Sequence, residues 1–133
     1  MARFPIRWHW RQFSYDDIKS KGDGSIVIHT PSLDMLDVLL KEWRDRGYKT
    51  MIDSAYRDAM HNARVGGAPR SMHRFGRAFD LACRRPLQPE LEALARSIGF
   101  TGIGRYNSFL HVDTGPARVW GLKPYTAPVP KEN

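Results

Sequence analysis

The sequence contains a single cysteine, Cys83, among its 133 residues. An internal disulfide therefore cannot form, and zinc sites built from several cysteines are excluded. Because Cys83 ends an apolar run that starts at Ala78, we expect a buried side chain rather than a reactive thiol. The sequence also lacks any run of about eighteen apolar residues, the length needed to cross a bilayer, so we expect no transmembrane segment.

The amino-terminal stretch Met-Ala-Arg-Phe-Pro-Ile-Arg-Trp lacks the apolar segment of a secretory signal peptide. We therefore expect the protein to be synthesised in the cytoplasm. With 41% hydrophobic residues, a chain of this length can bury one core but hardly two. We predict one domain over residues 1–122, with an aromatic arm at 1–13 packed on the core, and a Pro-rich extended tail at 123–133.

Acidic residues are fewer than basic ones, so the formal net charge is +7 and the isoelectric point is about 9.9. This balance favours an anionic partner such as nucleic acid, an acidic membrane surface or the acidic polymers of a bacterial wall. The basic residues are mostly dispersed among acids, so the alternative interpretation is a solvated basic surface. No recognised nucleic-acid motif is present, and we expect no nucleic-acid partner.

Three segments have the hydrophobic period of helices. The first begins with Thr30 and Pro31, ends at Gly47, and places on one face Leu33, Leu36, Leu40 and Trp43. The second is short, from Asp58 to Val65. The third runs from Gln88 to Ile98 and is ended by Gly99.

Between these helices lie four predicted strands. They cover Lys49 to Ser54, Arg77 to Ala82, Ile103 to Tyr106 and Phe109 to Asp113, the last two joined by a two-residue turn. Together the elements predict an α+β fold, a single small domain in which a central antiparallel sheet is flanked by helices.

The chain has five histidines, and two of them lie close to acids in segments rich in glycine and small residues. His73 precedes Asp80 by seven residues, and His111 precedes Asp113 by two. Zinc binds imidazole nitrogen and carboxylate oxygen, and a catalytic zinc site needs three protein ligands with one position left open. On a strand, Asp80 shares its face of the sheet with small residues, which leave room for a metal. His111 and Asp113 share a face of the next strand, so either of them could complete the set of three ligands.

The amino-acid sequence of these segments resembles that of the D-alanyl-D-alanine metallopeptidase family, in its compact bacterial and phage branch. The resemblance spans about residues 51–120, and its central matches are Ser71, His73, Gly76, Ala78, Asp80, Gly102, Gly104, Tyr106, Phe109, His111, Asp113 and Gly115. It implies one zinc ion per chain, held by His73, Asp80 and His111. Imidazole also suits zinc better than a further anionic ligand would.

Many members of that family have a glutamate base three residues before the last zinc ligand, and this chain has Ser108 there. We therefore assign the role of general base to Asp113, which shares a face with His111. The alternative role for Asp113 is to orient the imidazole of a ligand.

The resemblance also implies that Arg57 binds substrate, because a guanidinium can grip a peptide carboxylate with two hydrogen bonds. The alternative is an ion pair of Arg57 with Asp53 or Asp58. Ser71 either binds substrate or caps the turn that holds His73. His61, on a helix, is not expected to be a ligand.

These expectations describe a monomeric zinc metallopeptidase that hydrolyses peptide bonds in peptidoglycan stem peptides, as a carboxypeptidase or an endopeptidase. The absence of a signal peptide favours a phage or prophage endolysin, made in the cytoplasm and acting on the periplasmic or external wall after release. The first alternative is a metal-retaining wall-binding or virion module without activity, consistent with Ser108. The second is a nucleic-acid-binding domain that uses the basic, aromatic arm from Arg3 to Phe13.

Overall fold

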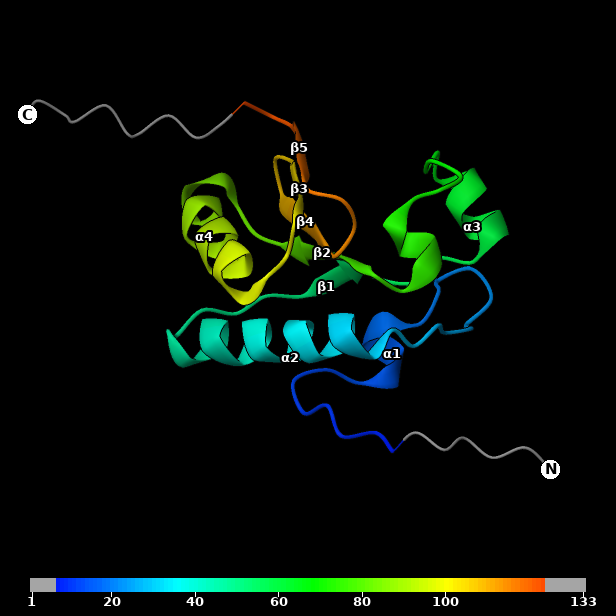
Figure 1. The fold of residues 1–133 in the computed structure, drawn as a ribbon, viewed down its shortest axis with the longest axis horizontal. Coiled ribbons are helices and arrows are strands. Elements are labelled where there is room, and N and C mark those ends of the chain that lie inside the picture. The colour runs from blue at the N-terminus through cyan, green and yellow to red at the C-terminus, as the bar shows by residue number, and fades with distance from the viewer. Residues whose placement is uncertain (1–6, 124–133) are drawn as a thin grey trace, which may run out of the picture.

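The structure, a computed structural model, describes residues 7–123 and combines helices with one sheet (Figure 1). The helices within this range are α1 (Tyr15–Ile18), α2 (Thr30–Asp45), α3 (Ala59–Arg64) and α4 (Gln88–Ile98), with 3-10 turns at Met72–Phe75 and Arg85–Leu87. The strands are β1 (Ile52–Ser54), β2 (Ala78–Ala82), β3 (Gly102–Arg105), β4 (Phe109–Asp113) and β5 (Arg118–Gly121). The predicted α+β class is therefore confirmed.

The strands form one five-stranded sheet in the order β1-β2-β4-β3-β5. Three of the four pairings are antiparallel, as predicted, while β3 and β5 run parallel. The predicted strand Lys49 to Ser54 is shorter than expected, because only Ile52–Ser54 pairs with β2. Strand β5 was not predicted, and it extends the sheet on the far side of β3.

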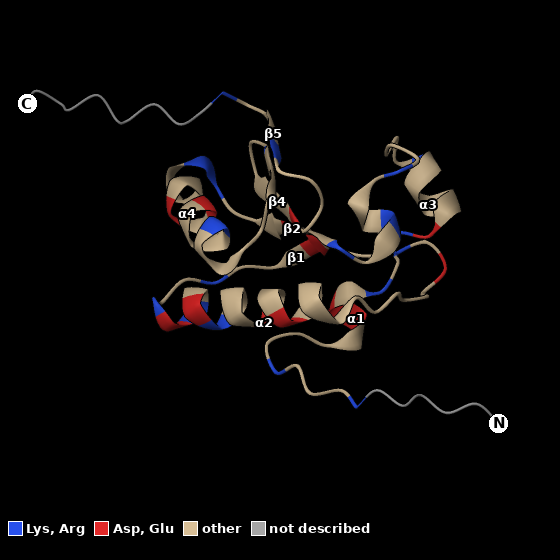
Figure 2. Cartoon of the chain, in the orientation of Figure 1, with Lys and Arg blue, Asp and Glu red and all other residues tan. Residues whose placement is uncertain are grey.

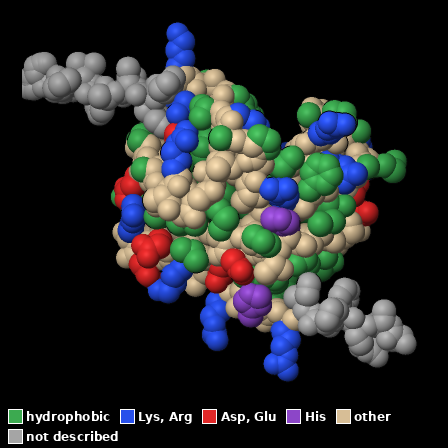
Figure 3. All heavy atoms as spheres, viewed as in Figure 1, with side chains coloured by type: hydrophobic (Ala, Val, Ile, Leu, Met, Phe, Trp, Pro, Cys, Tyr) green, Lys and Arg blue, Asp and Glu red, His purple; other side chains and the backbone are tan. Residues whose placement is uncertain are grey.

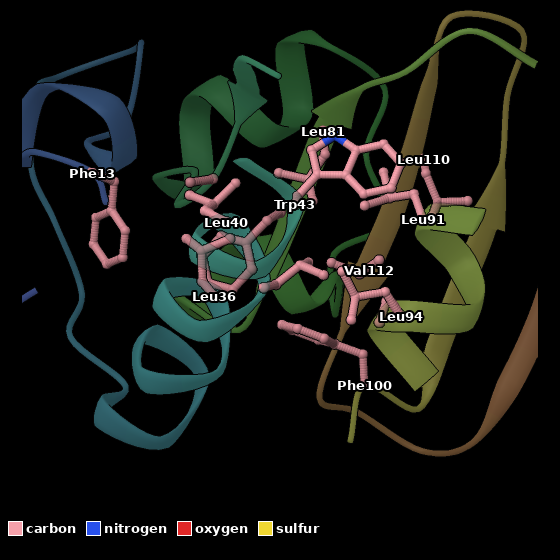
Figure 4. Packing of buried hydrophobic residues seen from close by; sticks show 14 of the residues in the cluster. Phe13, Leu36, Leu40, Trp43, Leu81, Leu91, Leu94, Phe100, Leu110 and Val112 are labelled. Atoms are coloured by element: carbon pink, nitrogen blue, oxygen red, sulfur yellow. The ribbon is translucent and has the colours of Figure 1, made fainter. Parts of the chain in front are cut away.

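One face of the sheet forms the core with α2 and α4 (Figure 4). The inward residues of β2 and β4 pack there together with the apolar stripes of both helices, and the labelled members include Leu36, Leu40, Trp43, Leu81, Leu91, Leu94, Leu110 and Val112. The predicted stripe of α2 is fully buried, which explains why this helix was readily identified from its period. Cys83 is also buried, as expected, and burial raises the pKa of its thiol to about 11.

Polar side chains occupy the opposite face of the same strands. Alternation along β2 and β4 separates Asp80 and His111 from the apolar residues that face the helices. Asp80 lies directly opposite His111 in the antiparallel register. The sheet thus holds an acid and an imidazole side by side on a rigid support.

The described part of the aromatic arm packs on the core as predicted. Trp10 and Phe13 are buried, and the Trp10 indole Nε1 donates to Asp34 on α2 at 2.8 Å. Trp8 remains 41% exposed beside them. Residues 1–6 of the predicted arm and 124–133 of the predicted tail lie outside the described residues.

Charged residues of both signs are interspersed along α2 and α4 (Figure 2). The basic residues are accordingly dispersed, as the sequence indicated, rather than gathered on one element. None of the helices in the described range is both long and apolar enough to cross a membrane.

Candidate metal centre

His73, Asp80 and His111 meet on the polar face of the sheet, although they come from three separate elements. His73 lies in the turn Met72–Phe75, Asp80 on β2 and His111 on β4. One ligand atom from each lies within 4.8 Å of the others, and all three residues are buried. These are the three residues that the sequence proposed as ligands.

A tight turn places His73 over the sheet. The turn ends at Gly76, whose φ of 69° lies in the left-handed region. A Cβ atom at Gly76 would lie 2.5 Å from the carbonyl oxygen of Val27, so no larger residue fits there without a shift. At the start of the turn, the His73 backbone N–H donates to the Ser71 hydroxyl at 3.2 Å. Ser71 thus acts as the cap that the sequence gave as one of its two roles, and it also lines the cavity described below.

Each imidazole has an inner nitrogen, which faces Asp80, and an outer nitrogen, which faces away from it. A hydrogen bond to the outer nitrogen fixes each ring. His73 Nδ1 lies 2.6 Å from the Ala55 carbonyl oxygen, and because a carbonyl only accepts, Nδ1 carries the proton. His111 Nε2 lies 2.6 Å from Asp113 Oδ2, and it donates to that carboxylate in the same way. In both rings the other nitrogen is then left facing the site.

Both inner nitrogens point at the same carboxylate oxygen. Asp80 Oδ1 lies 3.2 Å from His73 Nε2 and 2.9 Å from His111 Nδ1. With neutral rings, two nitrogen lone pairs and a carboxylate would repel one another, so the arrangement favours a positive charge between them, either a ring proton or a metal ion. The donor set of two imidazoles and one carboxylate fits zinc.

The electrostatics of the residues agree with a strongly polar centre. Burial opposes ionisation of Asp80, but its hydrogen bonds with His111 and His73 outweigh burial and hold its pKa below the usual range. Burial likewise opposes the charged form of His111, yet its hydrogen bonds to Asp113 and Asp80 raise its pKa. The centre therefore stabilises a carboxylate next to cationic or metal-bound partners.

Asp113 lies behind His111, on the side of the ring away from Asp80. Its side chain is fully buried, and Oδ1 accepts from the Gly115 backbone N–H at 2.9 Å. Arg118 binds both of its oxygens, from Nη1 at 2.9 Å and Nη2 at 2.8 Å. Burial opposes ionisation, but the contacts with His111, Arg118 and Gly115 hold the pKa of Asp113 at about 2. Such a carboxylate is arranged to orient His111, the second of the two roles considered from the sequence.

Arg57 approaches the centre from the other side. Its Nη2 lies 3.4 Å from Asp80 Oδ2, and its Nη1 donates to the Asn62 side chain at 3.2 Å. The structure contains neither of the ion pairs, with Asp53 or with Asp58, considered as alternatives for Arg57. Instead Asp58 caps α3 and accepts from the Ser20 hydroxyl.

The three candidate ligands open into a cavity of about 480 Å³, which also contains Arg57 and Ser71. One wall is the loop after α3, and the other is aromatic, formed by Tyr106, Phe109 and Trp120, with Arg118 beside them. The surface is hollowed between the region of α3 and that of β3 to β5 (Figure 3). Among the described residues that line the cavity, Asp80 is the only carboxylate.

The sequence reasoning assigned no role to Arg118 or Trp120, although both fall in segments where the resemblance was noted. The signal that could have identified Trp120 is Gly104, because a Cβ there would lie 2.7 Å from the indole ring. Two other polar residues lie away from the centre. His61 on α3 is not one of the clustered ligands, and Ser108 lines a separate groove.

A family model described as Peptidase M15 matches residues 11–113 of the chain. The matched range contains all three residues of the cluster, together with Arg57, Ser71 and Asp113. No curated protein matches the chain significantly.

Proposed function

Because the chain belongs to the peptidase M15 family, we propose that it is a zinc-dependent metallopeptidase that hydrolyses peptide bonds in peptidoglycan stem peptides. The observation that carries the proposal is the convergence of two imidazole nitrogens on one Asp80 oxygen at the base of an open cavity. Other functions of a basic domain would not require this buried donor set.

His73, Asp80 and His111 would hold the metal, which supplies polarisation of the scissile carbonyl and activation of water when bound. The hydrogen bonds to Ala55 and Asp113 keep both rings in the orientation and protonation state that metal binding needs. The cavity allows a peptide to reach this centre from solvent.

Arg57 would bind a carboxylate of the substrate. Its side chain is 16% exposed and lies at the cavity wall beside Asp80, so its guanidinium reaches both the centre and a bound peptide. A guanidinium in such a position can form two parallel hydrogen bonds to a carboxylate, which fixes the peptide relative to the metal.

Asp113 was assigned the role of general base from the sequence, but its two oxygens are occupied by His111, Arg118 and Gly115. The proposal for Asp113 is therefore that it orients His111 and increases the basicity of its inner nitrogen.

A wall substrate is supported by the resemblance of the motifs and by the net charge of +7, which would attract the chain to acidic wall polymers. The resemblance to the phage branch of the family extends the proposal to a phage or prophage endolysin. Cleavage as a carboxypeptidase releases a terminal residue, whereas cleavage as an endopeptidase separates cross-linked stems.

The test is digestion of purified sacculi, followed by mass spectrometry of the muropeptides, with and without a chelator. Shortened or separated stem peptides that disappear with chelator, and with His73→Ala, are the expected result. Their masses identify the bond that is cut.

Among residues 7–123 no second carboxylate lines the cavity, and this favours one other function, a wall-binding module that retains the metal. In that case the wild-type protein would contain zinc and sediment with sacculi, but it would release no product. That outcome would replace the peptidase proposal.

A further inference from the structure

Tyr106 lines the cavity, and its hydroxyl has a proton to donate. The Trp120 indole Nε1 is 2.8 Å from the Tyr106 oxygen, and because an indole N–H only donates, the tyrosine oxygen accepts. The hydroxyl proton is then free for another acceptor, and none is found within residues 7–123. Since accepting one hydrogen bond strengthens a hydroxyl as a donor, Trp120 makes Tyr106 a better donor to a ligand.

Packing fixes both aromatic side chains in place. The Tyr106 ring stacks on Phe109, with centroids 4.4 Å apart and planes 10° apart. The Trp120 ring lies over Gly104, where any side chain would collide with it, and its centroid is 4.8 Å from that of the His111 ring. One indole ring therefore connects the candidate ligand His111 with the Tyr106 hydroxyl.

Both arginines at the cavity already donate to protein acceptors. Arg57 donates to Ser54, Asn62 and Asp80, while Arg118 donates to Asp113 and to the Pro116 carbonyl. The Tyr106 hydroxyl differs from both because its proton has no acceptor in the described protein. It is also uncharged, so it suits an oxygen that becomes negative only during reaction.

We propose that Tyr106 is a catalytic residue that donates a hydrogen bond to the scissile carbonyl oxygen as that oxygen gains negative charge, and that Trp120 is its positioning residue. The proton stays on the tyrosine oxygen throughout, so no group is transferred to or from Tyr106. This inference rests on the proposed peptidase function. It adds the residue that stabilises the negative charge on the carbonyl oxygen.

The direct test compares Tyr106→Phe with wild type on a stem peptide that wild type hydrolyses. The kcat should fall by ~10²–10³-fold, the range for loss of one oxyanion donor, whereas KM and zinc content should stay within about twofold. Trp120→Phe keeps an aromatic ring but removes the indole N–H, so a smaller fall in kcat is expected. Tyr15→Phe is the matched control, because Tyr15, on α1, donates from its hydroxyl to the Gly24 carbonyl and does not line the cavity.

A binding measurement separates this inference from the proposed function. A phosphinate analogue of the stem peptide has a tetrahedral, negatively charged centre, and it should bind Tyr106→Phe at least ~10-fold more weakly than wild type. Unmodified product peptide should bind both proteins equally.

Full kcat in Tyr106→Phe, or equal phosphinate binding by the two proteins, overturns the inference while leaving the peptidase proposal intact. If wild type does not hydrolyse any stem peptide, the peptidase proposal fails first. In that case equal or absent phosphinate binding by both proteins overturns the inference as well.

Discussion

Asp113 supports His111 from behind, with its Oδ2 2.6 Å from the ring Nε2, while the opposite ring nitrogen faces Asp80. The carboxylate is fully buried and is held in turn by both terminal nitrogens of Arg118. A ligand imidazole whose outer N–H is bound to a carboxylate keeps one tautomer and one orientation. The pair would therefore hold His111 in the orientation that the proposed metal site needs.

Asp113→Asn tests this relationship. The amide oxygen can still accept from His111 Nε2, but the negative charge is lost, so zinc affinity should fall by ~10–100-fold. Saturating zinc should restore most of the turnover. Zinc titration by calorimetry, together with turnover at increasing zinc, measures both quantities.

The opposite result would return Asp113 to the role of general base. In that case Asp113→Asn would bind zinc as wild type does, but its turnover at saturating zinc would stay ~100-fold or more below wild type. Arg118→Met is a useful companion variant, because it removes the partner of Asp113 without touching its carboxylate.

The second prediction concerns the metal. Purified protein should contain about one zinc per chain, and either His73→Ala or Asp80→Ala should abolish binding because a three-ligand site loses one ligand. Chelation should also lower the melting temperature, since a metal that binds only the folded state stabilises it. Elemental analysis with thermal denaturation checks both points, and full zinc content in His73→Ala would remove that residue from the site.

The sequence predicted the elements that have strong local patterns. The helix Gln88–Ile98 and the strand Phe109–Asp113 were predicted with the bounds that the structure shows. Strand β5 was missed because Arg118, Val119 and Gly121 are mostly exposed, so no apolar alternation marks it. Its parallel pairing with β3 depends on the whole chain, which local patterns do not describe.

The predicted ligand set is brought together by the structure because residue type and spacing reflect the chemistry of metal binding. Strand alternation alone did not distinguish His111 from Asp113 as the third ligand, since both lie on one face of β4, and the choice of His111 came from the resemblance and from the preference of zinc for imidazole. The decisive contact comes from Arg118, which binds Asp113 and holds it away from the cavity. That contact joins β4 to a strand that the sequence did not predict.

A third prediction concerns substrate recognition by Arg57. Arg57→Lys keeps the charge but loses the planar pair of donors, so kcat/KM on a peptide with a free carboxylate should fall by ~10–100-fold. Wild type should lose activity to a similar extent when that carboxylate is amidated. Arg57→Lys and wild type should then hydrolyse the amidated peptide at about equal rates. A large difference between their rates on the amidated peptide would show that Arg57 acts through Asp80 instead.

The last prediction concerns the buried ion pair that joins α4 to β3. Arg105 donates to Glu92 from Nε at 2.8 Å and from Nη2 at 2.9 Å, and both residues are buried. Arg105→Met leaves the Glu92 carboxylate without this partner, so the free energy of unfolding should fall by ~3–5 kcal/mol. Glu92 also contacts Arg96, whose side chain is 43% exposed, and this contact favours the lower end of the range. The double variant Glu92→Gln with Arg105→Met also removes the negative charge of Glu92 and should recover part of the loss. Urea denaturation at fixed zinc concentration measures the free energy of unfolding of wild type, the single variant and the double variant. Equal stability of the two variants would show that the loss comes from packing of the Arg105 side chain rather than from its charge.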